Sequence, residues 1–349
     1  MQPRSRKVLA RRSLYIVSPV YDWVFFLGPP MAAFWLGVTI SGSWLTTSEF
    51  QFLGHEFAPA YLFIGVLIHA HIVIVFFRSH GDANIFKLYP NRFIALPLVL
   101  YLAMMSSLWI LITVSVLATF WDVYHSGLQT FGFGRIYDVR AGNDANVGRR
   151  LDIWLNHLLY AGPIVAGATM MAHFEDFNEY EDVQSAFLTS IPAFMETNQR
   201  YFTWSILGCG VSFIAYYIFS YLRFERQGYV VSFPKVVLLS TTGLCSILTW
   251  GFNTFGEAFF IMNFFHAIQY FGIVWWSEKK NMRKLFQLTN VPWGVPLTAV
   301  LFVGIASAYG LAAEVVNTDI RWFWAITLVC STMHFWYDGF IWSVRKKQV

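Results

Sequence analysis

Long apolar runs separated by short polar clusters dominate the chain. A helix needs about 20 mainly apolar residues to cross the hydrocarbon core of a bilayer, and these runs have that length. Because the third and fourth runs are almost contiguous and the fourth contains several polar residues, the fourth also fits a re-entrant or interfacial segment. We expect helices at 20–42, 57–78, 93–117, 119–138, 153–173, 201–222, 234–252, 256–276, 293–313 and 321–343.

Composition supports a membrane location. Of 349 residues, 56% are hydrophobic and only 13% are charged, with a mean hydropathy of +0.50. Soluble domains carry about 25% charged residues, so this chain has too few to coat a water-facing surface. We predict an all-α, polytopic transmembrane bundle of about ten helices, forming a single integral membrane domain over 1–349 with a basic cytoplasmic tail at 1–18. The basic residues lie in clusters between apolar runs, so no nucleic-acid partner is expected.

The loop charges predict an orientation. Excess Lys and Arg marks the cytoplasmic side of a membrane protein, and the N-terminal tail and every second loop are basic. Leaving out segment 119–138 would place basic loops on both sides. The expected location is the bacterial inner membrane, with both termini inside. The cytoplasmic loops would hold Arg78, Lys87, Arg92, Arg135, Arg140, Arg149, Arg150, Arg223, Arg226, Lys235, Lys279, Lys280, Arg283 and Lys284, and the outer loops Glu49, Glu56, the run 175–182, Glu314 and Asp319.

Cysteine-accessibility labelling tests this orientation. Single cysteines at Glu179 and Lys280 should react from opposite sides of the membrane, because one lies in an acidic loop and the other in a basic loop. Labelling of both from the same side would contradict the ten-helix topology.

Five of the nine histidines lie in the middle of predicted spans, away from the helix ends. His69 and His71 lie in the second helix, His125 in the fourth, His266 in the eighth and His334 in the tenth. In the predicted topology these four helices run in the same direction, and at 1.5 Å per residue the histidines share a band of about 10 Å. Ionisable groups at that depth are costly and mark functional sites. We therefore expect a shared metal site, although isolated histidines bonded to their neighbours would also fit.

Polar residues one helical turn away accompany these histidines, and residues three or four apart meet on a helix. A carboxylate in such a position can accept the second N–H of a metal-bound imidazole. Asp122 and Asp338 are placed for that role. The full set of expected supporting residues is Asp122, Gln129, Asn263, Gln269, Tyr270 and Asp338.

The second helix offers two histidines with opposite directions. His69 and His71 are two residues apart, so their side chains point about 200° apart on a helix. Only one of the two can belong to a single metal site, and the sequence does not say which.

Histidine-only ligation suits iron, copper or zinc better than magnesium or calcium. The favoured hypothesis is a non-haem iron oxygenase or oxidase acting on a lipophilic substrate from the membrane, such as an isoprenoid, a carotenoid or an acyl chain. Paired histidines could instead bind haem b in a cytochrome, and a proton-coupled transporter could relay protons along buried acids and histidines. The H-E-x-x-H, G-x-S-x-G, P-loop and desaturase histidine-box patterns are all missing.

Several short motifs carry a resemblance. The segments at 69–71, 124–127, 265–270 and 333–338, together with 18–22 and 25–30, resemble an uncharacterised family of bacterial histidine-rich polytopic membrane proteins. His334 followed by Asp338 is also similar, more distantly, to a motif of the Brp/Blh-type β-carotene 15,15′-dioxygenases. That resemblance implies single histidines from separate helices around one iron.

Overall fold

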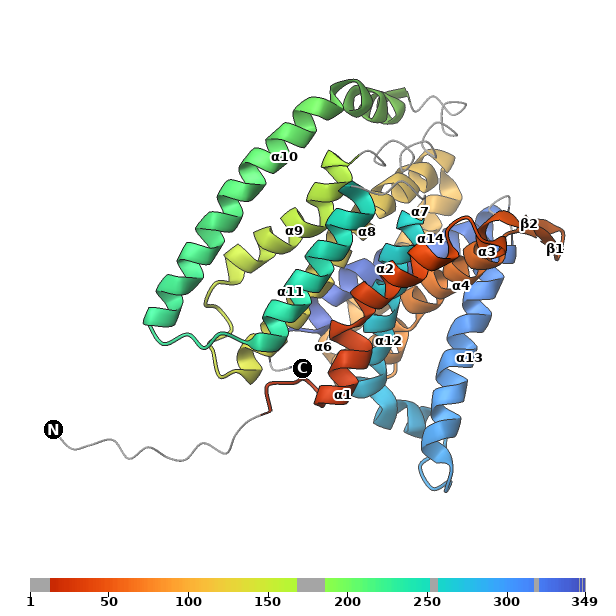
Figure 1. The fold of residues 1–349 in the computed structure, drawn as a ribbon. Helices are drawn as coiled ribbons and strands as arrows, with labels where there is room; N and C mark the ends of the chain where they lie inside the picture. The colour runs from red at the N-terminus through yellow and green to blue at the C-terminus, as the bar shows by residue number, and fades with distance from the viewer. Residues whose placement is uncertain are drawn as a thin grey trace.

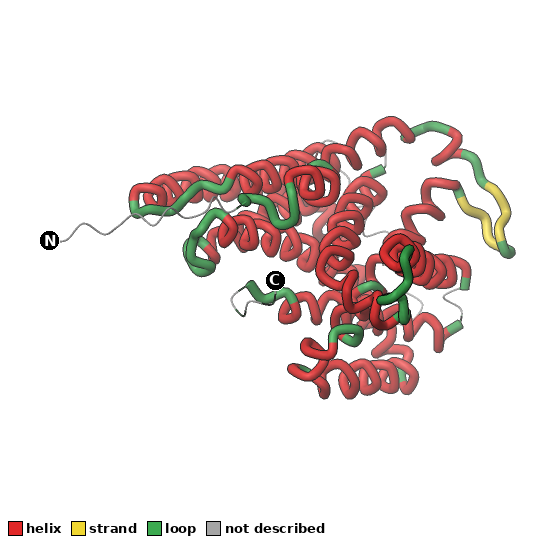
Figure 2. The backbone as a smooth tube through the Cα atoms, turned by 90° about the horizontal axis from the view of Figure 1, so that it is seen from below, coloured by secondary structure: helices red, strands yellow, loops and turns green. Residues whose placement is uncertain are grey.

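The computed structural model describes residues 13–167, 186–251, 257–316, 320–344, 346 and 348. These residues are mostly helical, which confirms the all-α prediction (Figure 1). A small antiparallel hairpin of β1 (Phe50–Phe52) and β2 (His55–Phe57) was not predicted and lies at the edge of the fold (Figure 2). The helices are α1 (Pro19–Asp22), η1 (Trp23–Leu27), α2 (Pro29–Ile40), α3 (Trp44–Thr47), α4 (Pro59–Val73), α5 (Val75–Ser79), α6 (Ala83–Leu88), α7 (Pro90–Ser106), α8 (Leu108–Arg140), α9 (Arg149–Ala166), α10 (Ala186–Arg226), α11 (Phe233–Ser246), η3 (Ile247–Gly251), α12 (Ala258–Leu285), α13 (Gly294–Val315) and α14 (Arg321–Ile341).

Six of the described helices are long and apolar enough to cross a membrane, or seven if the N-terminal pair is one bent span. The chain is therefore an integral membrane protein. The pair, Pro19–Leu27 and Pro29–Ile40, is bent by 49°. Prolines at the start of α2 explain the break, because Pro has no N–H to continue the preceding helix. The predicted outer run 175–182 lies outside the described residues.

The predicted boundary between the third and fourth helices is wrong. It was placed near residue 118, but α7 ends at Ser106 and α8 runs unbroken over 33 residues from Leu108. Ser107 between them is extended, with φ −144° and ψ 125°. Serine side chains compete for backbone hydrogen bonds, and the Ser106 hydroxyl donates to the Ala103 carbonyl. Ser106 and Ser107 thus interrupt the helix within an apolar run that hydropathy alone predicts to be continuous.

Four helices meet at the centre of the bundle: α4, α8, α12 and α14. Helix α14 packs on α4 and α8, and α12 packs on α2, α4 and α13. Helix α10 lies at one edge against α9, while α13 lies on the other side against α4 (Figure 1). The α4–α13 contact is close because Gly310 has no side chain: a Cβ there would collide with the Val66 carbonyl. Small residues permit such close approach between membrane helices.

Some of the cations assigned to cytoplasmic loops are instead buried. Arg78 pairs with Glu278 at 2.5 Å. Arg135 and Lys235 each contact the carboxylates of Asp138 and Asp152, at 2.5 to 2.8 Å. We call these last four residues the buried ionic cluster. It joins α8, α9 and α11 and carries no net charge, so these cations hold helices together and say little about orientation.

A tyrosine completes the buried ionic cluster. The Tyr229 hydroxyl donates to Asp138 at 2.5 Å, from the loop between α10 and α11. Burial, and next the negative charge of Asp138, raise the pKa of Tyr229, so the phenol remains a donor at neutral pH.

Removing one cation from the cluster should be costly. Breaking a buried pair leaves an uncompensated charge, so Lys235→Met should lower the free energy of unfolding by about 3–5 kcal/mol. Lys280→Met, at an exposed position on α12, should change it by less than about 0.5 kcal/mol. Thermal unfolding in detergent measures both, and equal melting temperatures would contradict the assigned role of the cluster.

Candidate metal centre

Four of the five predicted histidines come together in the centre of the bundle. His71 comes from α4, His125 from α8, His266 from α12 and His334 from α14. Their exposed fractions are 1%, 3%, 1% and 0%. The ring centres of neighbouring pairs lie 4.7 to 5.3 Å apart. The sequence therefore placed these residues at a common depth, and the packing of α4, α8, α12 and α14 turns all four toward one point.

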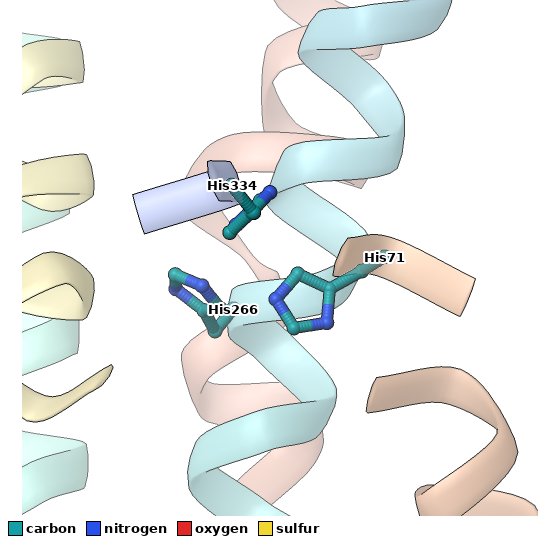
Figure 3. A group of neighbouring side chains, drawn as sticks. All are labelled: His71, His266 and His334. Atoms are coloured by element: carbon teal, nitrogen blue, oxygen red, sulfur yellow. The ribbon is translucent and has the colours of Figure 1, made fainter. Parts of the chain in front are cut away.

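Three of these imidazoles form a compact group that we call the histidine triad: His71, His266 and His334 (Figure 3). One ring nitrogen from each lies within 4.8 Å of the other two. Metal–nitrogen bonds of about 2.0–2.1 Å place two ligand nitrogens no more than about 4.2 Å apart. Shifts of less than about 1 Å therefore bring the triad to bonding distance.

The triad nitrogens lack protein partners. Both ring nitrogens of His71, Nε2 of His266 and Nδ1 of His334 are buried without a hydrogen bond of good geometry, and among the described residues only the backbone at Leu67, Ile68 and Ile72 lies near enough to His71 and His334 for weaker contacts. Buried polar atoms are nearly always hydrogen-bonded, so such exceptions need an explanation. A bound cation supplies one, since it satisfies several lone pairs at once. This donor set fits a metal ion.

His125 and Asp338 flank the triad on one side. His125 Nε2 is 3.1 Å from His334 Nε2 and 3.8 Å from an Asp338 carboxylate oxygen. With His334, these two residues form a second group of potential ligands. An imidazole that binds a metal through one nitrogen commonly donates a hydrogen bond from its other N–H to a carboxylate, a carbonyl or water. His334 can thus bind a metal through Nδ1 while its Nε2 contacts His125 or Asp338.

Two side chains hold Asp338 in place. The Tyr270 hydroxyl donates to its Oδ1 at 2.7 Å, and the Trp342 indole N–H donates to the same oxygen at 2.9 Å. Its other oxygen, Oδ2, faces the histidines. Asp338 is therefore oriented before any ligand binds.

The two glutamines connect the helices around the site. Gln129 donates to the His266 carbonyl and to the Gln269 side chain, at 3.1 and 3.2 Å. Gln269 in turn donates to the Phe26 carbonyl at 2.8 Å. These bonds position α8 and α12, and no ring nitrogen of the triad takes part in them.

Three of the predicted site residues are not at the site. His69 points away from the triad, toward the Glu314 carboxylate at 2.8 Å. Asn263 is half-buried and donates to the Phe259 carbonyl of its own helix. Asp122 shares a hydrogen bond with Ser126 rather than with His125. Residues three apart on a helix differ by about 60° in direction, which is enough to turn Asp122 and Asn263 aside from the site.

The remaining histidines have other surroundings. His80 contacts the Ser79 hydroxyl and the Phe93 carbonyl. His157 stacks on Tyr124 with ring centres 4.6 Å apart. His55 lies in the hairpin, and His173 falls outside the described residues.

A cavity of about 220 Å³ opens beside the site. At one end it is lined by His125, Asp338 and Tyr270, and further along by Gly132, Arg135 and Arg149. None of the triad residues lines it. The sequence signal for this cavity was weak, because its lining comes from separated parts of α8, α12 and α14. The cavity ends at His125 and Asp338, which flank the triad.

Comparisons with protein-family models, with curated proteins and with solved structures find no match to the chain.

The two histidines of α4 give a matched pair of variants. His71→Ala should remove bound metal because it deletes one of the triad nitrogens. His69→Ala, two residues away, should retain it because His69 contacts Glu314 instead. Metal per protein, measured by mass spectrometry on the purified variants, distinguishes the two. Equal metal loss in both variants would show that the assignment is wrong.

Proposed function

We propose that the protein is a membrane-embedded metalloenzyme, a non-haem iron oxygenase or oxidase that acts on a lipophilic substrate. The observation that carries the proposal is the set of buried, unpartnered ring nitrogens of the histidine triad. Polar atoms without partners in an apolar bundle are costly, and a metal ion is the simplest group that satisfies one nitrogen of each of the three imidazoles at once. A bacterial inner membrane remains the expected location.

The donor set narrows the choice of metal. Three neutral imidazoles with a carboxylate nearby suit iron, and also zinc or copper, and they do not suit magnesium or calcium. A metal held by three protein ligands keeps an open position and supplies Lewis-acid or oxygen chemistry there. Iron is favoured because histidine and carboxylate ligands with open positions are typical of non-haem oxygenases.

The arrangement is less suited to haem. A bis-histidine haem needs a flat slot between two imidazoles that is wide enough for the macrocycle. Around the triad, neighbouring ring centres lie about 5 Å apart in several directions, so a third and fourth imidazole fill that plane. This packing favours a bare ion over a cytochrome.

The chain itself would perform the remaining tasks. Asp338, held by Tyr270 and Trp342, keeps its free oxygen toward His125 and His334. His125 separates the triad from the cavity, so a substrate entering from the cavity meets His125 and Asp338 first. Apolar packing around the site excludes bulk water, which strengthens every electrostatic contact within it.

Metal content of the purified protein tests the proposal. Wild type should hold about one metal ion per chain and show no Soret band. His266→Ala and His334→Ala should each abolish binding, because each removes a ligand. Asp338→Asn should have a milder effect and should lower metal affinity or activity about 10- to 100-fold, as is typical when a residue that supports a metal ligand is replaced.

A folded and active wild type without metal would end the metalloenzyme proposal and favour a proton-coupled transporter. An intense Soret band would favour the cytochrome. Leu at position 266 serves as the folding control, since an apolar side chain is tolerated there better than an unpaired polar one.

A further inference from the structure

A second set of potential metal ligands lies on the side of the histidine triad that faces the cavity. It consists of His125, His334 and Asp338, and we call it the histidine–aspartate group. His125 and Asp338 line the cavity, whereas none of the triad residues does. A molecule in the cavity therefore meets the histidine–aspartate group before the triad.

The distances within this group match those around one metal ion. The Nε2 atoms of His125 and His334 are 3.1 Å apart, and Oδ2 of Asp338 lies 3.8 Å from the first and 4.0 Å from the second. A circle through three points with these separations has a radius of about 2.1 Å, the usual length of a bond from a metal to an imidazole nitrogen or a carboxylate oxygen. An ion at its centre would bind all three atoms with little movement of the side chains.

The carboxylate of the group is already oriented for such an ion. Oδ1 of Asp338 accepts hydrogen bonds from Tyr270 and Trp342, which leaves Oδ2 to face the histidines. Two imidazoles and one carboxylate with open positions are typical of non-haem iron(II) oxygenases, whereas the triad offers imidazoles alone. Oxygen chemistry on a substrate therefore fits the histidine–aspartate group, which is also the group beside the cavity.

His334 belongs to both groups. Its Nδ1 is buried without a hydrogen bond of good geometry, and its Nε2 faces His125. The two ring nitrogens of a histidine are distinct ligand atoms, so one imidazole can bind an ion through each. Metal–nitrogen bonds of about 2.0–2.1 Å on both sides of the ring would place the two ions about 6 Å apart.

We propose that the centre binds two metal ions, the second held by His125, His334 and Asp338 and joined to the first by the His334 imidazole. The second ion faces the cavity and is the one that a substrate meets. The inference rests on the proposed function, since the triad holds the first ion, but the second ion can be counted separately.

The second ion should bind more weakly than the first. The Nε2 atoms of His125 and His334 lie at hydrogen-bonding distance from each other, so an ion must displace the hydrogen between them. The triad nitrogens have no comparable hydrogen bond to give up. Two cations about 6 Å apart also repel each other. Protein purified without added metal should therefore carry about one ion, and the second site should fill when metal is supplied.

A copper titration of the full-length protein in nanodiscs, after removal of metal with a chelator, tests the second site. Cu²⁺ is the probe because it binds nitrogen ligands more tightly than the other divalent ions of its row and carries one unpaired electron. Equilibrium dialysis counts the bound copper, and electron paramagnetic resonance reports whether two ions share a bridge. Wild type should bind two copper ions. The first should give the spectrum of an isolated ion, and the second should remove that spectrum, because spins on two ions joined by one imidazole couple.

Three variants locate the second ion. His125→Ala should bind one copper ion, whose spectrum further copper does not remove, and the retained ion shows that the triad is still folded. Asp338→Ala should also stop at one ion because it lacks the carboxylate ligand. His157→Ala is the control: it removes an imidazole that stacks on Tyr124 of α8, and it should bind two coupled ions like wild type.

Three results would overturn the inference and leave the triad in place. Wild type could saturate at one copper ion, the spectra of two ions could simply add, or His125→Ala could still bind a coupled pair. Wild type that binds no copper would instead end the proposed function together with the second site.

Discussion

The burial of imidazoles without hydrogen-bond partners is the constraint on which the centre of this structure depends. Four ring nitrogens of the triad have no protein partner. At about 1–3 kcal/mol for each unsatisfied buried polar atom, they cost about 4–12 kcal/mol. Whole domains are stable by only about 5–15 kcal/mol. A bundle that brings one nitrogen from each of three imidazoles within 4.8 Å of the others is therefore best explained by a ligand that binds those three nitrogens.

The surrounding structure holds the triad against this cost. Asp338 is fixed by Tyr270 and Trp342. Trp342 also lies under the Arg78 guanidinium, 3.9 Å from its ring centre, and Arg78 pairs with Glu278 of α12. The buried ionic cluster fixes α8 against α9 and α11 in the same way. Charged groups thus secure the helices at some distance from the site, while neutral imidazoles occupy its centre.

Much of this arrangement could be predicted from residue pattern and depth. Long apolar runs identified helices, and histidines at similar depths identified α4, α8, α12 and α14 as the helices of the site. The sequence could not choose between His69 and His71, because that depends on the rotation of α4. It also assigned Arg135 and Lys235 to loops, since only tertiary packing brings Asp138 and Asp152 to them. The predictions for Asp122 and Asn263 were wrong for a related reason, because residues one helical turn apart do not point in the same direction.

X-ray absorption spectroscopy of the metal-loaded wild type tests the central claim most directly, because it reports the atoms bonded to the metal. We expect one metal ion with at least three imidazole nitrogens at about 2.0–2.2 Å, no sulfur and no porphyrin scattering. His71→Ala should show no signal from bound metal, whereas His69→Ala should give the spectrum of wild type. A first shell of oxygen atoms without imidazole scattering would contradict the account.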